Sequence, residues 1–342
     1  MKPTRREFLG AGAAAAGLGM AGCLDAVGLG DEDIDADGYA AFFPLYDFAQ
    51  QVSGGAMTFT EPVGTGRMGH GWSPDATLVP DVASTRVFVY LDTPEFSWAQ
   101  DIATTLERDH PEVALVDLFD VSGARTNGED DGHHHDEEHN HDGDHSVDEG
   151  GHDGHDHAGR DPHIWLDPVR AEAMVKSLGT ELGAVQPDSQ STFTENAAAY
   201  AEEIRAVDEQ LTAVVEDATL DTAVLVGHNS FQYLANRYGL TLETPVGISP
   251  NASASQRDIG GLLDVIDQQG IETVLYDPFE AGGAGEYPQL VQTVFENSAV
   301  TDAKPFSPIS GTTEQWEAND WGWVEQMTEL NIPSLEAALN AQ

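Results

Sequence analysis

The chain has 342 residues and carries 60 acidic side chains against 14 basic ones, for a formal net charge of −46. This balance excludes a nucleic-acid-binding role, because phosphate contacts need a basic face, and the single cysteine excludes both an intrachain disulfide and a cysteine-based zinc site. Repulsion among so many carboxylates is screened at molar salt, where the Debye length falls to about 3 Å, so we expect a halophilic protein.

Residues 1–22 have the composition of an export signal. A basic start containing Arg5 and Arg6 precedes an apolar segment rich in alanine and glycine, the order found in twin-arginine signal peptides. That segment is shorter than the ~20 apolar residues that a membrane-spanning helix needs. Cys23 follows small residues at its end, where lipoproteins carry their lipidated cysteine, and residues 23–37 are acidic and predict a flexible tether. We therefore expect a lipid-anchored protein on the outer face of the cell membrane.

Residues 38–186 predict a first α/β lobe. Strands are expected over the β-branched and aromatic runs MTFTEPV (57–63), VFVYL (87–91) and VALVDL (113–118), and helices over PLYDFAQQVSGG and FSWAQDIATTLE. Such alternation favours a mostly parallel sheet.

A His- and acid-rich insertion over residues 127–160 interrupts this lobe. It holds nine of the chain's 13 histidines and almost no apolar residue, so it cannot bury enough surface to become ordered. Histidines without fixed spacing on such a segment predict weak binding of several metal ions, and we interpret the segment as an auxiliary collector that serves a tighter site. These histidines are His133, His134, His135, His139, His141, His145, His152, His155 and His157.

A long helix is expected over residues 189–217. Seven apolar residues recur there at alternating steps of four and three, which places them on one helix face: Phe193, Ala197, Tyr200, Ile204, Val207, Leu211 and Val214. At 1.5 Å per residue the helix would be about 40 Å long, enough for residues 187–218 to join two lobes.

The second α/β lobe is expected over residues 219–342. Strands are predicted at TAVLV and TVLYD, and helices at NSFQYLANRYGL, IGGLLDVIDQQG and YPQLVQTVFENSAV. The prediction is thus two Rossmann-like lobes with mostly parallel sheets, joined by one long rigid helix.

Three histidines outside the insertion stand where a ligand would bind. In open α/β sheets ligands lie beyond the carboxyl ends of the strands, where His228 follows TAVLV and is expected to open a helix. Asp277 stands in the same position after TVLY, with Glu280 three residues later. His70 lies in a Gly-rich loop after MTFTEPV, and His163 lies within DPHIWLDP. We expect these side chains to form a metal site in the cleft between the lobes.

The motifs PLYDFAQQVSGG, GHGWSP, DPHIWLDP after a His-rich insertion, GHNSFQYLANRYGL and VLYDPFE occur in this order. Their order resembles that of the ZnuA-like zinc- and manganese-binding lipoproteins of metal ABC importers, over essentially the whole mature chain. The resemblance implies that His70, His163 and His228 bind the metal. Asp277 is the first choice for the fourth ligand, and Glu280 is the alternative. It also implies a monomeric extracytoplasmic protein whose partners are an ABC permease and its ATPase.

Three imidazoles and one carboxylate suit Zn²⁺, and manganese remains the alternative because geometry and supply can override the affinity order. Two other classes of function stay open. A zinc hydrolase or lyase also uses three histidines and a water, and an adhesin or surface scaffold would use the metal for structure only. An acid that closes the coordination shell argues for carriage, whereas an open water position beside a general base argues for catalysis.

Overall fold

The computed structural model describes residues 36–119, 121, 161–247, 253–281 and 286–341. The predicted signal, Cys23, nearly all of the tether and the whole His-rich insertion lie outside these residues, and the predictions about them remain predictions. Among the described residues, no helix combines the length and the apolar composition needed to cross a membrane.

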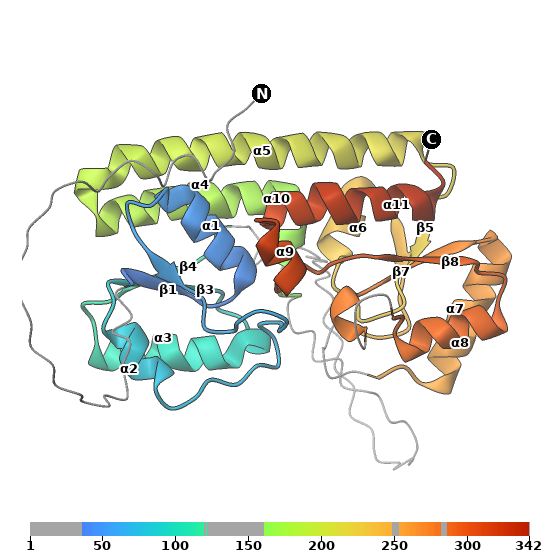
Figure 1. Cartoon of the computed structure of the whole chain (residues 1–342), viewed down its shortest axis with the longest axis horizontal. Helices are drawn as coiled ribbons and strands as arrows, with labels where there is room; N and C mark the ends of the chain where they lie inside the picture. The colour runs from blue at the N-terminus through green and yellow to red at the C-terminus, as the bar shows by residue number, and fades with distance from the viewer. Residues whose placement is uncertain (1–35, 120, 122–160, 248–252, 282–285, 342) are drawn as a thin grey trace, which may run out of the picture. The chain divides into compact units, whose positions relative to one another are not determined.

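The first sheet is parallel, with strand order β2-β1-β3-β4. Its strands are β1 (Gly38–Ala40), β2 (Phe59–Thr60), β3 (Val87–Tyr90) and β4 (Ala114–Asp117). Helix α1 (Phe43–Ser53) covers one face, and α2 (Leu78–Ala83) and α3 (Ser97–Asp109) lie on the other (Figure 1).

Two of the three strands predicted within residues 38–186 are confirmed nearly to the residue. The third, MTFTEPV, forms a strand only at Phe59–Thr60. Because β2 is an edge strand and Pro62 has no amide hydrogen, pairing cannot continue through the rest of that run.

Two long helices pack against each other along the sheets (Figure 1). They are α4 (Pro168–Val185) and α5 (Gln190–Asp217), joined by a 3₁₀ turn at Pro187–Ser189. Asp167 caps α4 by accepting a hydrogen bond of 3.0 Å from the amide of Val169, and Pro168 occupies the first position. All seven residues of the predicted stripe are buried, so the 28-residue helix α5 confirms the predicted helix over 189–217.

The second half forms two parallel strand pairs, β5 (Thr222–Val224) with β6 (Thr241–Glu243) and β7 (Thr273–Tyr276) with β8 (Asp302–Pro305). A parallel bridge between Leu225 and Leu275 connects the two pairs, giving the order β6-β5-β7-β8. The helices of this half are α6 (Gln232–Tyr238), α7 (Gln256–Gln269) and α8 (Gln289–Asn297).

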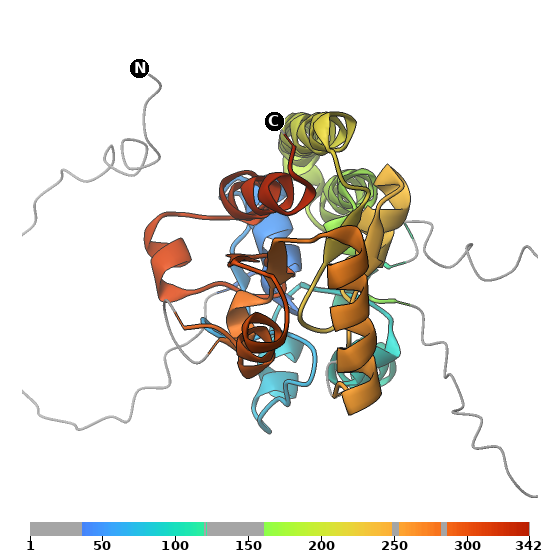
Figure 2. The ribbon, with the colours of Figure 1, turned by 90° about the vertical axis from the view of Figure 1, so that its right-hand side faces the viewer.

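The last 30 residues contain helices that were not predicted from the sequence. They are α9 (Glu314–Ala318), α10 (Trp323–Gln326), a π-helical turn (Met327–Asn331) and α11 (Ile332–Leu339). Helix α11 lies beside α5, and in Figure 2 α11 and α4 both lie below α5, to its left and right.

The C-terminal segment also ties the second half to the first. The backbone amide of Trp323 donates to Asp47 on α1 at 2.9 Å, and its indole N–H donates to the carbonyl of Trp165 at 2.8 Å. The indole of Trp165 in turn donates to the carbonyl of Pro308 at 2.8 Å. The described residues between 36 and 341 belong to one compact unit, and the lobe boundaries at residues 187 and 219 remain a prediction.

Candidate metal centre

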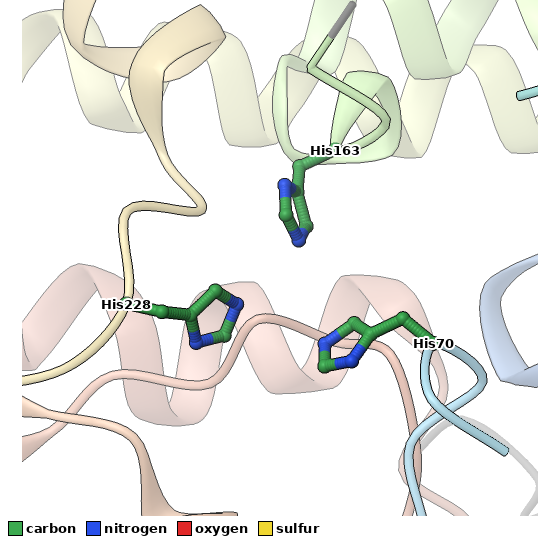
Figure 3. Close-up of side chains that lie close together, drawn as sticks. All are labelled: His70, His163 and His228. Atoms are coloured by element: carbon green, nitrogen blue, oxygen red, sulfur yellow. The ribbon is translucent and has the colours of Figure 1, made fainter. Parts of the chain in front are cut away.

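His70, His163 and His228 come from three separate loops and point toward one another (Figure 3). One ring nitrogen of each lies within 4.8 Å of the other two, and all three side chains are buried. Their Nε2 atoms have no hydrogen-bond partner among the described residues. A buried polar atom without a partner costs about 1–3 kcal/mol, so three such nitrogens facing one point fit a bound cation. We call these residues the imidazole group.

His163 is oriented by the residue two positions before it. Oδ1 of Asp161 accepts a hydrogen bond of 3.0 Å from the His163 amide and lies 2.7 Å from Nδ1 of its ring. A proton on Nδ1 leaves the lone pair on Nε2, which faces the other imidazoles. The hydroxyl of Tyr233 donates to the Asp161 carbonyl at 3.0 Å, which fixes this turn to helix α6.

His70 lies in the loop between β2 and α2, which packs tightly on the first half. The indole of Trp98 donates to the carbonyl of Gly69 at 3.1 Å. A Cβ at position 69 would lie 2.6 Å from the Cβ of Phe42, so a side chain here would force the loop away. Burial, reinforced by the two neighbouring imidazoles, lowers the pKa of His70 to about 3. The ring is therefore neutral at physiological pH and can serve as a ligand.

The same loop meets Gly311 and Thr312 of the second half in a close backbone contact. The amide of Gly66 donates to the carbonyl of Thr312 at 2.7 Å. An ideal Cβ on Gly311 would lie only 2.1 Å from the carbonyl oxygen of Arg67. The absence of a side chain at position 311 thus lets the His70 loop dock here, and we call this contact the loop seam.

His228 lies in the loop between β5 and α6. The prediction that it opens a helix is wrong, because α6 begins at Gln232. The loop backbone is tied instead to the chain after β6, through a parallel bridge between His228 and Val246 and a 3.2 Å hydrogen bond from the Asn229 amide to the Gly247 carbonyl.

Asp277 and Glu280 form a second donor group with His228, which we call the carboxylate group. One ligand atom from each of the three residues lies within 4.8 Å of the others, so His228 belongs to both groups. Oδ1 of Asp277 accepts from the Phe279 amide at 2.8 Å, whereas its buried Oδ2 has no hydrogen-bond partner in the part of the chain that the structure describes. Burial raises the pKa of Asp277 to about 7, against the opposing influence of His228. Oε1 of Glu280 lies 3.7 Å from Nδ1 of His228.

Residues 39–330 match the family described as zinc-uptake complex component A, periplasmic (ZnuA). The chain belongs to the ZnuA family. This is a family of zinc-uptake components and not an enzyme family. The predicted resemblance is confirmed.

Among curated relatives, the ZnuA-family chain is 30% identical over 297 residues to the zinc-binding lipoprotein AdcA of Streptococcus pneumoniae. The alignment covers 86% of this chain and 54% of that protein, so the chain spans about half the length of the curated relatives it matches.

Solved structures agree with the fold. The Zn(II)-bound ZnuA-like domain of Streptococcus pneumoniae AdcA superposes with a TM-score of 0.67 and 24% identity, over 89% of this chain and 99% of that one. A mutant of the laminin-binding adhesin Lmb of Streptococcus agalactiae gives a TM-score of 0.69 and 20% identity, over 89% and 99%. The predicted α/β fold with mostly parallel strands and a long helix is confirmed.

The structure brings all five predicted donor residues into the two groups, but the side chains that hold them in place were not predicted from the sequence. Asp161 lies two residues before His163 in the motif DPHIWLDP. A carboxylate so close to a ligand histidine is a common way to orient the ring, and this pattern was the available signal. The loop seam had no such signal in the sequence.

Proposed function

We propose that this protein is the extracytoplasmic substrate-binding component of a metal ABC importer, which captures Zn²⁺ and delivers it to a membrane permease driven by its ATPase. The observation that carries the proposal is the imidazole group, with its three buried and unpaired Nε2 atoms. Zinc bonds to nitrogen at about 2.0 Å, which sets tetrahedral ligand nitrogens about 3.3 Å apart. The three rings therefore need only a small inward shift to bind one ion.

Asp277 is the best fourth ligand. Its Oδ2 is buried and unpaired among the described atoms, and it shares the carboxylate group with His228. A bound dication would replace the proton that burial otherwise holds on this side chain. An acid that closes the shell leaves no position for a reactive water, which favours a carrier over a zinc hydrolase or lyase.

Zinc is favoured over manganese because three of the four donors are imidazoles. Manganese prefers harder oxygen donors, so His228→Glu should move selectivity toward Mn²⁺. Competition between the two ions on the wild type and on this variant measures the shift, and an unchanged preference would contradict the donor argument.

The parts of the chain outside the described residues complete the proposal. A lipid on Cys23 would hold the receptor at the outer membrane surface, and the S. pneumoniae relative is itself named a lipoprotein. The His-rich insertion would raise the local zinc concentration near the imidazole group. We propose a monomeric receptor, exported by the twin-arginine route and suited to molar salt.

The decisive experiment is metal binding by the mature protein, purified at high salt. We expect one tightly bound zinc per chain by mass spectrometry and calorimetry, and a loss of at least about 100-fold in affinity for His163→Ala or His228→Ala. His110→Ala is the matched control, because that side chain is 40% exposed and contacts Glu112 instead of the site. Unchanged affinity in both site variants would refute the proposal.

An adhesin or scaffold that uses zinc only for structure remains the other candidate, since the neighbour Lmb is named as an adhesin. The two roles differ in what happens without metal. A carrier must stay folded when no metal is bound, so we expect cooperative thermal unfolding of the protein after chelation. A structural metal predicts instead that the apo chain is already unfolded.

A further inference from the structure

Among the five donor residues, Glu280 alone reaches solvent. Its side chain is 36% exposed, whereas His70, His163, His228 and Asp277 are between 1% and 6% exposed. Glu280 is therefore the donor that a hydrated cation arriving from solvent can contact most easily.

The carboxylate group offers a second set of donor atoms for a cation. Asp277, Glu280 and His228 offer two oxygens and one nitrogen within 4.8 Å of one another. Independently, Oδ2 of Asp277 is buried with no hydrogen-bond partner in the described chain, although the residue is only 3% exposed. Two oxygen donors with an exposed side suit a divalent cation that still keeps some of its water.

His228 connects the carboxylate group to the imidazole group. A neutral imidazole has one nitrogen with a free lone pair, and the other carries the proton. Nδ1 of His228 lies 3.7 Å from Glu280, and its Nε2 belongs to the buried, unpaired atoms of the site. The ring can therefore serve only one group at a time, which makes the two groups alternatives for a single ion.

We propose that Glu280 is the exchange ligand of this site: a partly hydrated divalent cation is bound first by the carboxylate group and then passes to the imidazole group, and it leaves by the same route. This inference rests on the proposed function. It assigns Glu280 to the path of the ion and leaves Asp277 as the fourth ligand of the bound state.

The two roles give different kinetics. A ligand of the bound state mainly slows dissociation, so its removal raises the dissociation rate constant and weakens affinity. An exchange ligand lowers the free-energy barrier to both binding and release of the ion, because it replaces the water molecules of the hydrated ion one at a time. Its removal therefore slows association and dissociation together and leaves the equilibrium nearly unchanged.

The test is Glu280→Gln in the full mature chain, followed by stopped flow with Zn²⁺ and a chelating dye. Measurement at molar salt screens the general effect of the protein's charge. We expect both rate constants to fall about tenfold and the dissociation constant to change by less than about threefold. Glu272→Gln is the matched control, since it removes an exposed carboxylate just before β7, at the opposite end of that strand from Asp277, and should change neither rate.

A faster dissociation with unchanged association would make Glu280 an ordinary ligand of the bound state and overturn the inference. Unchanged rates, or rates that fall equally in Glu272→Gln, would overturn it as well. Failure of the proposed function is distinguishable, because in that case the wild type holds no zinc tightly and His163→Ala has no effect.

Discussion

Gly311→Ala tests whether the loop seam holds the metal centre together. The added Cβ would lie 2.1 Å from the carbonyl oxygen of Arg67. An ordinary contact between carbon and oxygen needs about 3.3 Å, so one of the two backbones must move by about 1 Å. Overpacking of this kind costs about 1–3 kcal/mol, and we expect the free energy of unfolding to fall by that amount.

The displacement should reach the metal because His70 lies only three residues beyond Arg67. The Gly66–Thr312 hydrogen bond of 2.7 Å belongs to the same seam and would be strained by the same movement. Metal-binding side chains must be held within about 0.5 Å of their working positions. We therefore expect zinc affinity to fall about tenfold, or about 1.4 kcal/mol.

The assay combines urea unfolding of the apo protein at fixed molar salt with a zinc competition titration. Gly260→Ala is the control, because a Cβ on that residue of α7 would meet no described atom within 4 Å. Alanine is a better helix former than glycine, so the control should keep its affinity and match or exceed wild-type stability by up to about 1 kcal/mol. If Gly311→Ala matched Gly260→Ala in both measurements, the seam would have no role in holding His70.

Three further predictions follow from the structure and the sequence. Asp161→Ala should weaken zinc binding about 10- to 100-fold, whereas Asp161→Asn keeps an acceptor for the His163 ring and should recover most of the affinity in the same titration. Burial, with the charge of Glu317, raises the pKa of Glu61 from 4.5 to about 7, so the stability contributed by its protonated form is complete below pH 4.5 and is lost as pH rises through about 7. Glu61→Gln should therefore melt above the wild type at about pH 8 and together with it at about pH 4, and a constant difference would contradict this assignment. Deletion of residues 132–157 should remove weak zinc sites from the calorimetric trace and keep one tight site; loss of the tight site would show that the insertion is part of it.

Sequence periodicity predicted α5 well because an apolar stripe reports burial directly. The start of α7 was placed three residues late, at Ile259. The missed signal was Ser255, whose hydroxyl accepts from the Asp258 amide while the Asp258 carboxylate accepts from the Ser255 amide. A serine followed three residues later by an acid is the sequence form of this capping box, so the boundary at Gln256 was readable.

The donor residues were predictable for a related reason. Carboxyl ends of parallel strands gather at one edge of a sheet, which marked Asp277 and the loop of His228. Contacts that fix the loops were not predictable from local pattern. The hydrogen bond from the Trp323 amide to Asp47 joins residues 276 positions apart, and neither residue belongs to a sequence motif that predicts a contact with the other. Such long-range contacts depend on the completed fold.

Both sheets pack into one buried cluster, which limits how the metal centre can open. Leu225 and Leu275 of the second sheet belong to the same buried cluster as Val87 of the first sheet and Leu211 of α5. A hinge that parted the two sheets would expose this cluster. At about 25 cal/mol per Å², exposing roughly 400 Å² of apolar surface would cost about 10 kcal/mol, as much as the whole stability of a typical domain. Release of the ion through local movement at Glu280, with the sheets fixed, avoids that cost, so we expect exchange kinetics to respond to changes in this loop far more than to changes along α5.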